Sequence, residues 1–352
     1  MSVSRMPGLC NTQAQNTLKT GLRSLVDWVS ATIPPLYTPQ EILELLGLNF
    51  NDFVVQEWGV EGYQRHVNLG NIKLYYDHPK EDMGLWLDIT GSGCRFYESL
   101  ELFSWGQVLQ ILKALDGNIT RIDLAVDDFK KYLDLDKMTY AIVSGTVRSK
   151  FKKARYLVDN NLGDGTKRGH TIYFGSSTSR LQVRFYDKIL ERNNNNVNVQ
   201  DDIKHWVRAE IQFRHERAER IAQILINNGN IGLALKGTLK NYITFCVKSN
   251  DTNKSRWKVV KWWDKFLGDI EALKLTDVAP DFTIEKTYNW VENKIAPTLA
   301  MLAKAFDGDI GLIYNLIQSG EKRLSKRHEM MINNYLNKNK KNLPNMSRTK
   351  DS

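Results

Sequence analysis

Cysteine is scarce in this chain of 352 residues. The three cysteines, Cys10, Cys94 and Cys246, are far apart and form no C-x-x-C pair, so the sequence indicates neither a disulfide framework nor a zinc site. An uncharged apolar run long enough to span a bilayer is also lacking, and polar residues interrupt the apolar ones near the start of the chain. We therefore expect a protein of the reducing cytoplasm without a membrane partner.

Acidic residues are outnumbered. Lys and Arg total 49 against 40 Asp and Glu, which gives a formal net charge of +9 and a pI near 9.2. The apolar content of 42% and charged content of 25% are typical of a globular protein with one large or two ordinary domains. The positive charge favours a polyanionic partner such as nucleic acid, although many basic proteins bind none.

Three stretches have a polar face at strand spacing, and the first contains a tyrosine. Val183 and Phe185 point one way, whereas Arg184, Tyr186 and Lys188 point the other. On this pattern Tyr186 is presented to solvent between two cations, which favour its phenolate and attract a phosphate. Tyr186 is therefore a candidate nucleophile toward a phosphodiester, although an ordinary cross-strand aromatic has the same pattern.

The other two stretches supply carboxylates. Asp123 and Asp127 lie on one face of a predicted strand, separated on that face only by an alanine, and a divalent cation would offset their repulsion. The stretch 206–214 turns Arg208 and Glu210 to its polar face. If the three strands share a sheet, these faces bring together the groups needed for metal-assisted phosphoryl transfer to a tyrosine.

Four motifs in order give the chain a family resemblance. They are Arg-Ile-Asp-Leu-Ala-Val-Asp at 121–127, Tyr-Phe-Gly-Ser at 173–176, Arg-Phe-Tyr-Asp-Lys at 184–188 with a glutamate at 191, and Trp-Val-Arg-Ala-Glu-Ile at 206–211. This series resembles the Rep_trans family of replication initiation factors. That family includes rolling-circle plasmid initiators, filamentous-phage replication proteins and relaxases of some integrative and conjugative elements. The resemblance covers about residues 50–225.

The resemblance implies a site-specific DNA nickase. It cuts one strand of an origin, stays bound to the 5′ phosphate through a tyrosine, and so starts rolling-circle replication or conjugative transfer. The motif match places that tyrosine at Tyr186; Tyr173 is the competing nucleophile, but it lacks the flanking cations. Members of the family commonly recruit a host helicase of the PcrA type and can act as homodimers.

Supporting roles can be assigned to the neighbouring residues. Mg²⁺ or Mn²⁺ held by Asp123, Glu210 and Asp127 would polarise the scissile phosphate, although Asp127 as a cap of the strand end is an alternative. Arg184 and Lys188 would hold the phosphate and lower the pKa of the tyrosine. A related class of nickases uses a His-hydrophobe-His motif, but none of the six histidines has that spacing, so carboxylates must carry any metal.

A basic run follows the amphipathic helix predicted at 134–144. Aromatic residues, Phe151 and Tyr156, are interleaved with its cations, so the run is suited to holding a DNA backbone and stacking a base, or it is a solvated helix face. The candidate DNA-binding residues are Arg148, Lys150, Lys152, Lys153, Arg155 and, from the third stretch, Arg208.

The order of predicted elements indicates an α+β protein with an antiparallel sheet and flanking helices, followed by a mainly helical C-terminal region. Leu22, Leu25, Val26 and Val29 have helical spacing, which predicts a helix near the start. The expected parts are an N-terminal helical segment at 1–47, a nicking domain at 48–225, a helical domain at 226–336 and a basic disordered tail at 337–352.

Two other functions are compatible with these patterns. A non-enzymatic DNA-binding regulator built on the same sheet needs the basic surfaces but has no use for Tyr186 and the carboxylates. A metal-dependent nuclease that activates water would cut DNA and leave no protein attached to it.

Overall fold

The computed structural model divides the chain into two compact units, residues 1–278 and 279–352, which are described separately. The residues that the structure describes are 21–195, 199, 203–227, 230–271, 273, 284, 288, 291–322, 324, 328, 329, 332, 333, 335 and 336, without the side chains of 293 and 294. The predicted tail at 337–352 and the first 20 residues lie outside them.

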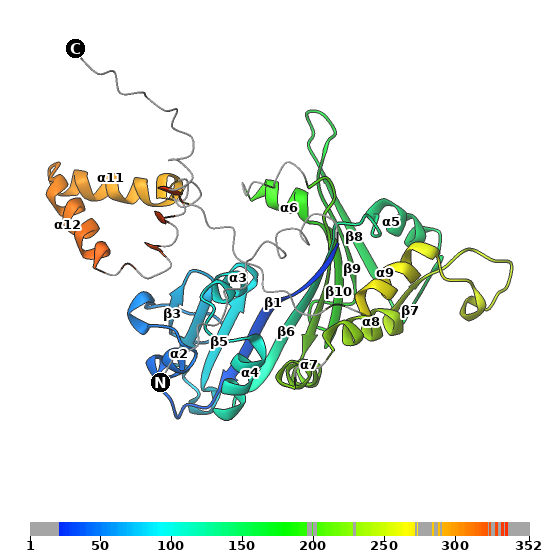
Figure 1. Cartoon of the computed structure of the whole chain (residues 1–352), viewed down its shortest axis with the longest axis horizontal. Coiled ribbons are helices and arrows are strands. Elements are labelled where there is room, and N and C mark those ends of the chain that lie inside the picture. The colour runs from blue at the N-terminus through cyan, green and yellow to red at the C-terminus, as the bar shows by residue number, and fades with distance from the viewer. Residues whose placement is uncertain are drawn as a thin grey trace, which may run out of the picture. The chain divides into compact units, whose positions relative to one another are not determined.

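An antiparallel sheet of ten strands forms the framework of the first unit (Figure 1). Its strands are β1 (Leu22–Ile33), β2 (Val54–Gln56), β3 (Arg65–Leu69), β4 (Ile72–Tyr76), β5 (Leu85–Thr90), β6 (Asn118–Asp128), β8 (Ala154–Asn160), β9 (Lys167–Phe174), β10 (Leu181–Asp187) and β11 (Val207–Arg214). They are ordered β2-β3-β4-β5-β1-β6-β11-β10-β9-β8. Short strands β7 (Val147–Ser149) and β12 (Ile243–Phe245) form a separate pair.

Helices connect the strands, and the predicted α+β class with an antiparallel sheet is confirmed. The helices of the first unit are α2 (Pro39–Leu45), α3 (Gly91–Ser99), α4 (Trp105–Ala114), α5 (Leu135–Val143), α6 (Lys188–Asn194), α7 (Glu216–Ile226), α8 (Ile231–Tyr242) and α9 (Lys261–Glu271), with short 3-10 helices at Phe50–Asp52, Glu81–Met83 and Lys254–Arg256. The second unit contains a π-helical turn at Val291–Ile295, α11 (Ala296–Ala305) and α12 (Ile310–Glu321). Within the described ranges, none of the helices is both long and apolar enough to cross a membrane.

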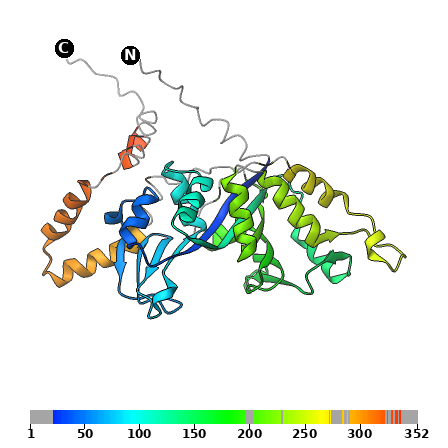
Figure 2. The same ribbon diagram turned by 90° about the horizontal axis from the view of Figure 1, so that it is seen from below.

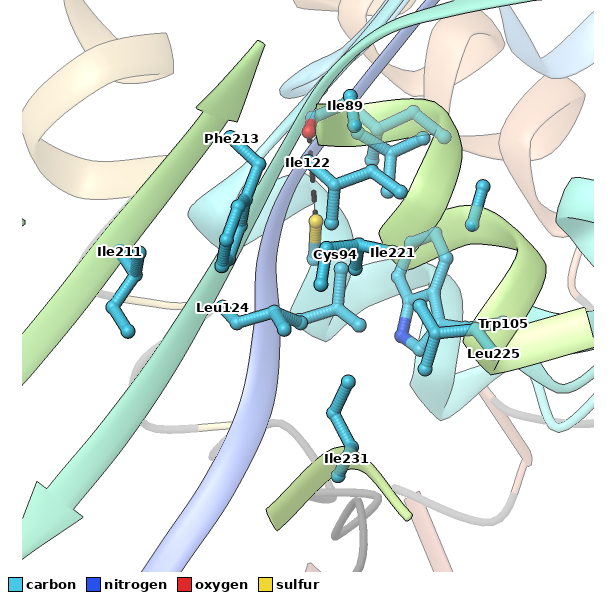
Figure 3. Close-up of a cluster of buried hydrophobic side chains, with 14 of the residues drawn as sticks. Ile89, Cys94, Trp105, Ile122, Leu124, Ile211, Phe213, Ile221, Leu225 and Ile231 are labelled. Atoms are coloured by element: carbon cyan, nitrogen blue, oxygen red, sulfur yellow. Dashed lines mark hydrogen bonds between the residues drawn. The ribbon is translucent and has the colours of Figure 1, made fainter. Parts of the chain in front are cut away.

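One face of the sheet is covered by helices, and the main core lies between them (Figure 2). Figure 3 shows Leu124 of β6 and Phe213 of β11 in one buried cluster with Ile221 of α7 and Trp105 of α4. The thiol of Cys94 lies in the same cluster and donates to the carbonyl of Ile89. Because alternate residues of a strand point to opposite faces, the polar residues of these strands are left on the other face.

The predicted N-terminal helix is wrong, because residues 22–33 form β1 in the middle of the sheet. The register of β1 with β6 shifts between Val26 and Trp28, so Asp27 is the extra residue of a β-bulge. The shift changes which residues of β1 face the core, and the resulting spacing of apolar residues imitates a helix. The helix start predicted at Thr38 is correct: Thr38 and Glu41 form a capping box at the start of α2.

The boundary predicted between residues 225 and 226 is not where the structure divides the chain. Leu235 of α8 and Trp263 and Phe266 of α9 are fully buried in the same core as the strands. An amphipathic helix has to bury its apolar stripe, and the sheet offers these helices a surface to bury it on. The helical second half therefore begins as part of the sheet unit.

Candidate active site

The polar face of the sheet brings the predicted residues together on neighbouring strands. Arg23 of β1, Asp127 of β6, Arg208 of β11 and Tyr186 of β10 are cross-strand neighbours and form one continuous row. Glu210 lies opposite Arg184 in the next row. The prediction that β6, β10 and β11 lie side by side and turn their acids and the phenol to one face is therefore confirmed.

Tyr186 is enclosed by charged groups. The guanidinium carbon of Arg184 lies 4.9 Å from the centroid of the tyrosine ring, and Nζ of Lys188 lies 5.4 Å from it. The phenol Oη donates a hydrogen bond to Oε2 of Glu210 at 3.3 Å. The predicted exposure of Tyr186 is wrong, since only 6% of the residue is accessible. Lys188 does not continue the strand, because it is the first residue of α6.

Burial decides the pKa of the tyrosine. It raises the pKa of Tyr186 well above its ordinary value, and the carboxylate of Glu210 adds to the rise. Arg208 and Arg184 lower the pKa, but they do not outweigh the loss of hydration. The expectation that flanking cations favour the phenolate is therefore wrong for this state of the protein. The phenol is neutral, and a proton acceptor is needed before its oxygen can act as a nucleophile.

Glu210 is placed to accept that proton. Its pKa is raised to about 7, mainly by burial and further by the nearby carboxylates of Asp27 and Asp123. Arg184 opposes the rise, because its Nη2 donates to Oε2 of Glu210 at 2.7 Å. A carboxyl group with a pKa near neutrality changes its charge in the range where a general base works best.

Asp127 belongs to a buried ion network. Its Oδ2 accepts hydrogen bonds from Nε and Nη2 of Arg23 at 3.0 and 2.6 Å, and its Oδ1 accepts one from Nε of Arg208 at 2.7 Å. Burial alone would raise the pKa of Asp127, but Arg208 and Arg23 outweigh it and hold the pKa below its ordinary value. Two guanidinium groups already satisfy this carboxylate, so Asp127 does not fit the predicted role of metal ligand.

Arg208 does not fit the predicted role of a DNA-contacting surface residue. It is only 5% exposed, and its Nη1 donates to Oδ1 of Asp27 at 2.9 Å while its other nitrogens bind Asp127. Arg208 thus joins Asp27 and Asp127 beside Tyr186, its cross-strand neighbour. The positive charge of Arg208 lowers the pKa of Tyr186.

Asp27 is a site residue that the sequence analysis missed. It occupies the bulge of β1, and its charge acts on Asp123, Glu210 and Tyr186. The available signal was an acid within the otherwise apolar stretch 25–29, which the helical assignment hid. A bulge commonly redirects a side chain at a functional site.

Asp123 has a partner of its own. Nε of Arg121 donates to Oδ1 of Asp123 at 2.9 Å, and the guanidinium of Arg121 lies 3.7 Å from the ring centroid of Trp28. Burial raises the pKa of Asp123, and the charge of Asp27 adds to it, although Arg121 opposes both. Asp123 and Glu210 are diagonal neighbours across β6 and β11. In the described part of the chain, no three His, Cys, Asp or Glu residues form a group that could hold a metal ion by themselves.

The other acids near the tyrosine have structural roles. Asp128 accepts hydrogen bonds from the backbone N–H groups of Lys130 and Leu133 and fixes the turn after β6. Asp187 caps the N-terminus of α6. Glu191 forms an ion pair with Lys188 at 2.8 Å.

The basic run is not a helix face. Arg148 lies in β7, where its Nη1 donates to the carbonyl of Ser255 at 2.5 Å, and Nζ of Lys150 donates to Oδ1 of Asn241 at 2.5 Å. These two cations hold a loop and a helix of the protein itself. The remaining three are exposed on the approach to β8 and in that strand; they are Lys152, Lys153 and Arg155.

The sheet and its polar face define an α+β protein in which a tyrosine, carboxylates and guanidinium groups are packed together. Residues 117–327 match the family model of the replication initiation factor (Rep_trans), and residues 23–110 match that of the rolling circle replication initiation protein N-terminal domain. The first match covers more than half of the chain, so this chain belongs to the replication initiation factor family.

Two relatives extend the comparison. The chain is 27% identical over 327 residues to a putative DNA relaxase NicK of Bacillus subtilis, covering 92% of this chain and 93% of that protein. It is also similar to the solved structure of a rolling circle replication initiator protein from Geobacillus stearothermophilus, with 34% identity and a TM-score of 0.67. That match covers 73% of this chain and 99% of the solved one.

Proposed function

We propose that this chain is a site-specific single-strand DNA endonuclease and strand transferase that forms a covalent 5′-phosphotyrosine through Tyr186. It would nick an origin to start rolling-circle replication or conjugative transfer. The observation that carries the proposal is the hydrogen bond from Oη of Tyr186 to Oε2 of Glu210 at 3.3 Å. Family membership and the names of the two relatives, an initiator and a putative relaxase, support the same reaction.

The proposed chemistry begins with the neutral phenol. As Oη attacks the phosphorus, its proton passes to Glu210, whose pKa of about 7 suits a proton acceptor. A new bond joins Oη to phosphorus, the bond from phosphorus to the 3′ oxygen breaks, and that oxygen takes a proton from water and leaves as a hydroxyl group. One phosphodiester bond replaces another, so its bond energy is kept in the phosphotyrosine. A free 3′ hydroxyl can therefore attack the phosphotyrosine and rejoin the strand.

The cations around the tyrosine would stabilise the charge that develops on the phosphate. When Glu210 takes up the proton it becomes neutral, and Arg184 loses the carboxylate that it binds in the resting protein. Its planar guanidinium is then available to the phosphate and can bind two of its oxygens at once. Burial and the charge of Arg208 lower the pKa of Lys188. Its Nζ lies 5.4 Å from the centroid of the Tyr186 ring, where its ammonium form would be a second cation near the phosphate.

We further propose that Mg²⁺ or Mn²⁺ binds at Asp123 and at Oε1 of Glu210, while Oε2 of Glu210 remains the proton acceptor of Tyr186. Both are buried carboxyl groups with raised pKa values, and the charge of Asp123 adds to the cost of ionising Glu210, which a divalent cation would offset. Two carboxylates together with a substrate phosphate are a common set of Mg²⁺ ligands. The ion would neutralise charge on the scissile phosphate.

The proposed partners follow from this function. The substrate is origin DNA, single-stranded at the nick. A host helicase of the PcrA type, a homodimer and a cytoplasmic location are expected from the family that the sequence resembles, and they remain part of the proposal.

A covalent adduct tests the proposed function. DNA selected from a random pool by binding to the full chain is incubated with the protein and Mg²⁺ or Mn²⁺, with and without a chelator. We expect a metal-dependent nick and a nucleotide-bearing peptide that contains Tyr186 in mass spectrometry. Binding without a nick would indicate a regulator instead, and a nick with a free 5′ phosphate and no attached peptide would indicate a nuclease that uses water.

A further inference from the structure

The β8–β9 hairpin has a solvent-exposed leucine in its loop. Its loop projects past the neighbouring strands (Figure 1), and Leu162 in that loop is fully exposed. Tyr156, Leu157 and Val158 of β8 are also exposed large apolar residues. β8 is the last strand of the sheet, so the hairpin forms one edge of the sheet and exposes apolar side chains there.

The loop that carries Leu162 is held by its own hydrogen bonds. The N–H of Asn161 donates to the carbonyl of Thr166 at 2.8 Å, and the N–H of Gly165 donates back to the carbonyl of Asn161 at 2.8 Å. Oδ1 of Asn161 accepts from the N–H of Gly163, and Oδ1 of Asp164 accepts from the N–H of Thr166. A turn closed in this way does not need an apolar side chain for its folding, so Leu162 serves another purpose.

The hairpin is continuous with the candidate active site. Tyr186 of β10 is opposite Thr171 of β9, and Thr171 is opposite Leu157 of β8. One row of cross-strand neighbours therefore leads from the tyrosine to the exposed edge. With strands about 4.8 Å apart, the backbone of Leu157 lies roughly 10 Å from that of Tyr186. A DNA strand that crosses the polar face at Tyr186 meets the hairpin within about three nucleotides, at about 3.4 Å per nucleotide.

A second row contributes an aromatic and two cations. Tyr173 of β9 lies between Arg184 of β10 and Arg155 of β8, and the guanidinium carbon of Arg155 is 4.9 Å from its ring centroid. A tyrosine between two arginines, one strand in from the open edge, suits a nucleobase and its phosphate. The hairpin thus offers single-stranded DNA a path toward Tyr186.

The charges of the hairpin favour DNA as its partner. Its exposed cations are Lys152, Lys153, Arg155, Lys167 and Arg168, against Asp159 and Asp164. Lys167 is paired with Asp136, and Oδ1 of Asp164 is engaged in the turn. A cationic stem with an apolar tip is complementary to a duplex, which has phosphates outside and stacked bases inside, and proteins insert leucine between base steps in this way.

We propose that the β8–β9 hairpin is a wedge that separates DNA strands next to the nick. Leu162 inserts at the boundary between paired and unpaired bases, the stem cations bind the flanking phosphates, and the freed strand passes over Tyr173 to Tyr186. This inference rests on the proposed nicking function and specifies its substrate as a junction of duplex and single strand. A protein strand that pairs with β8 is the competing occupant, and the experiment below decides between them.

The test compares two DNAs with one nick sequence, the first an unpaired oligonucleotide and the second a duplex. Leu162→Ser is compared with wild type and with Leu233→Ser, a matched change at an exposed leucine of α8. We expect Leu162→Ser to cut the oligonucleotide at the wild-type rate and the duplex at least about tenfold slower, since a wedge residue acts only on paired DNA. Leu233→Ser should match wild type on both.

A second readout does not depend on cleavage. In a duplex with 2-aminopurine beside the nick sequence, wild type should raise the fluorescence by unstacking the base, and Leu162→Ser should not. Wild-type fluorescence and rates in Leu162→Ser would overturn the wedge and leave the hairpin as a protein-docking edge. An equal loss on both DNAs would also contradict the wedge. The proposed function fails separately, if the wild-type protein forms no adduct with the oligonucleotide.

Discussion

Oη of Tyr186 lies 3.3 Å from Oε2 of Glu210, across the strand pair β10 and β11. Glu210 is opposite Arg184, two residues before Tyr186 on the same face of β10, so the phenol reaches the carboxyl group diagonally. Burial raises both pKa values and keeps the proton on the phenol at rest. The pair therefore combines a neutral nucleophile with a base that titrates near neutral pH.

The first prediction concerns the pH dependence of cleavage. Glu210 accepts a proton only when it is ionised, so the rate of adduct formation should rise with pH through the pKa of Glu210, which is about 7 without metal and falls when Mg²⁺ or Mn²⁺ binds beside it. Single-turnover cleavage of an unpaired oligonucleotide measures this rate. Glu210→Gln should be at least about 100-fold slower with no inflection near pH 7, which is the usual scale for loss of a general base. Glu191→Gln is the control, and an unchanged inflection in Glu210→Gln would assign the titration to another group.

The second prediction concerns stability. A carboxyl group with a raised pKa binds its proton more tightly in the folded state, so its contribution is present below its ordinary pKa and is lost as pH rises through about 7. Glu210→Gln should therefore melt at a higher temperature than wild type at pH 8, by a few degrees, and nearly equally at pH 5. Thermal unfolding at both pH values gives the comparison. A lower melting temperature of the variant at pH 8 would show that ionised Glu210 stabilises the fold.

The third prediction separates Asp127 from Asp123. Asp127→Asn removes the buried carboxylate that Arg23 and Arg208 share and leaves Arg208 with Asp27 alone, so it should lower the free energy of unfolding by about 3 to 5 kcal/mol. Asp123→Asn removes an acid whose pKa is raised, so it should cost far less stability but weaken Mn²⁺ binding. Chemical denaturation and metal titration distinguish them. A stable Asp127→Asn protein with weakened metal binding would restore Asp127 as a metal ligand.

The fourth prediction tests where the first unit ends. Trp263 is fully buried against the sheet core, so Trp263→Ala should destabilise the whole unit by about 3 to 5 kcal/mol. Trp257→Ala, at a partly buried position before α9, is the matched control with a smaller effect. Denaturant unfolding should remain one transition for strands and helices alike. A separate early transition confined to residues after 225 would favour an independent helical domain.

The parts of the fold that could be predicted are the strands in which apolar and polar residues alternate in the sequence and the apolar ones are the residues that face the core. β10 and β11 each alternate apolar and polar residues without a break, so their core and polar faces were assigned correctly, and with them the positions of Tyr186 and Glu210. Turn residues between the predicted strands correctly indicated the β9–β10 hairpin.

The rest depends on contacts between distant segments. The bulge at Asp27 gives the apolar residues of β1 a helical spacing, so the strand was predicted as a helix. The ion pair of Arg23 with Asp127 joins residues 104 positions apart. Local spacing carries no signal for such a pair. The same distant groups bury Tyr186, so its neutral state and its need for a base follow only from the assembled sheet.

The account depends most directly on which phenol carries the DNA. Tyr186→Phe and Tyr173→Phe, on neighbouring strands of the same face, are incubated with the selected DNA and Mg²⁺ or Mn²⁺, and the protein that migrates with DNA under denaturing conditions is quantified. The proposed chemistry predicts no covalent adduct for Tyr186→Phe and an adduct for Tyr173→Phe. An adduct that persists in Tyr186→Phe would contradict it.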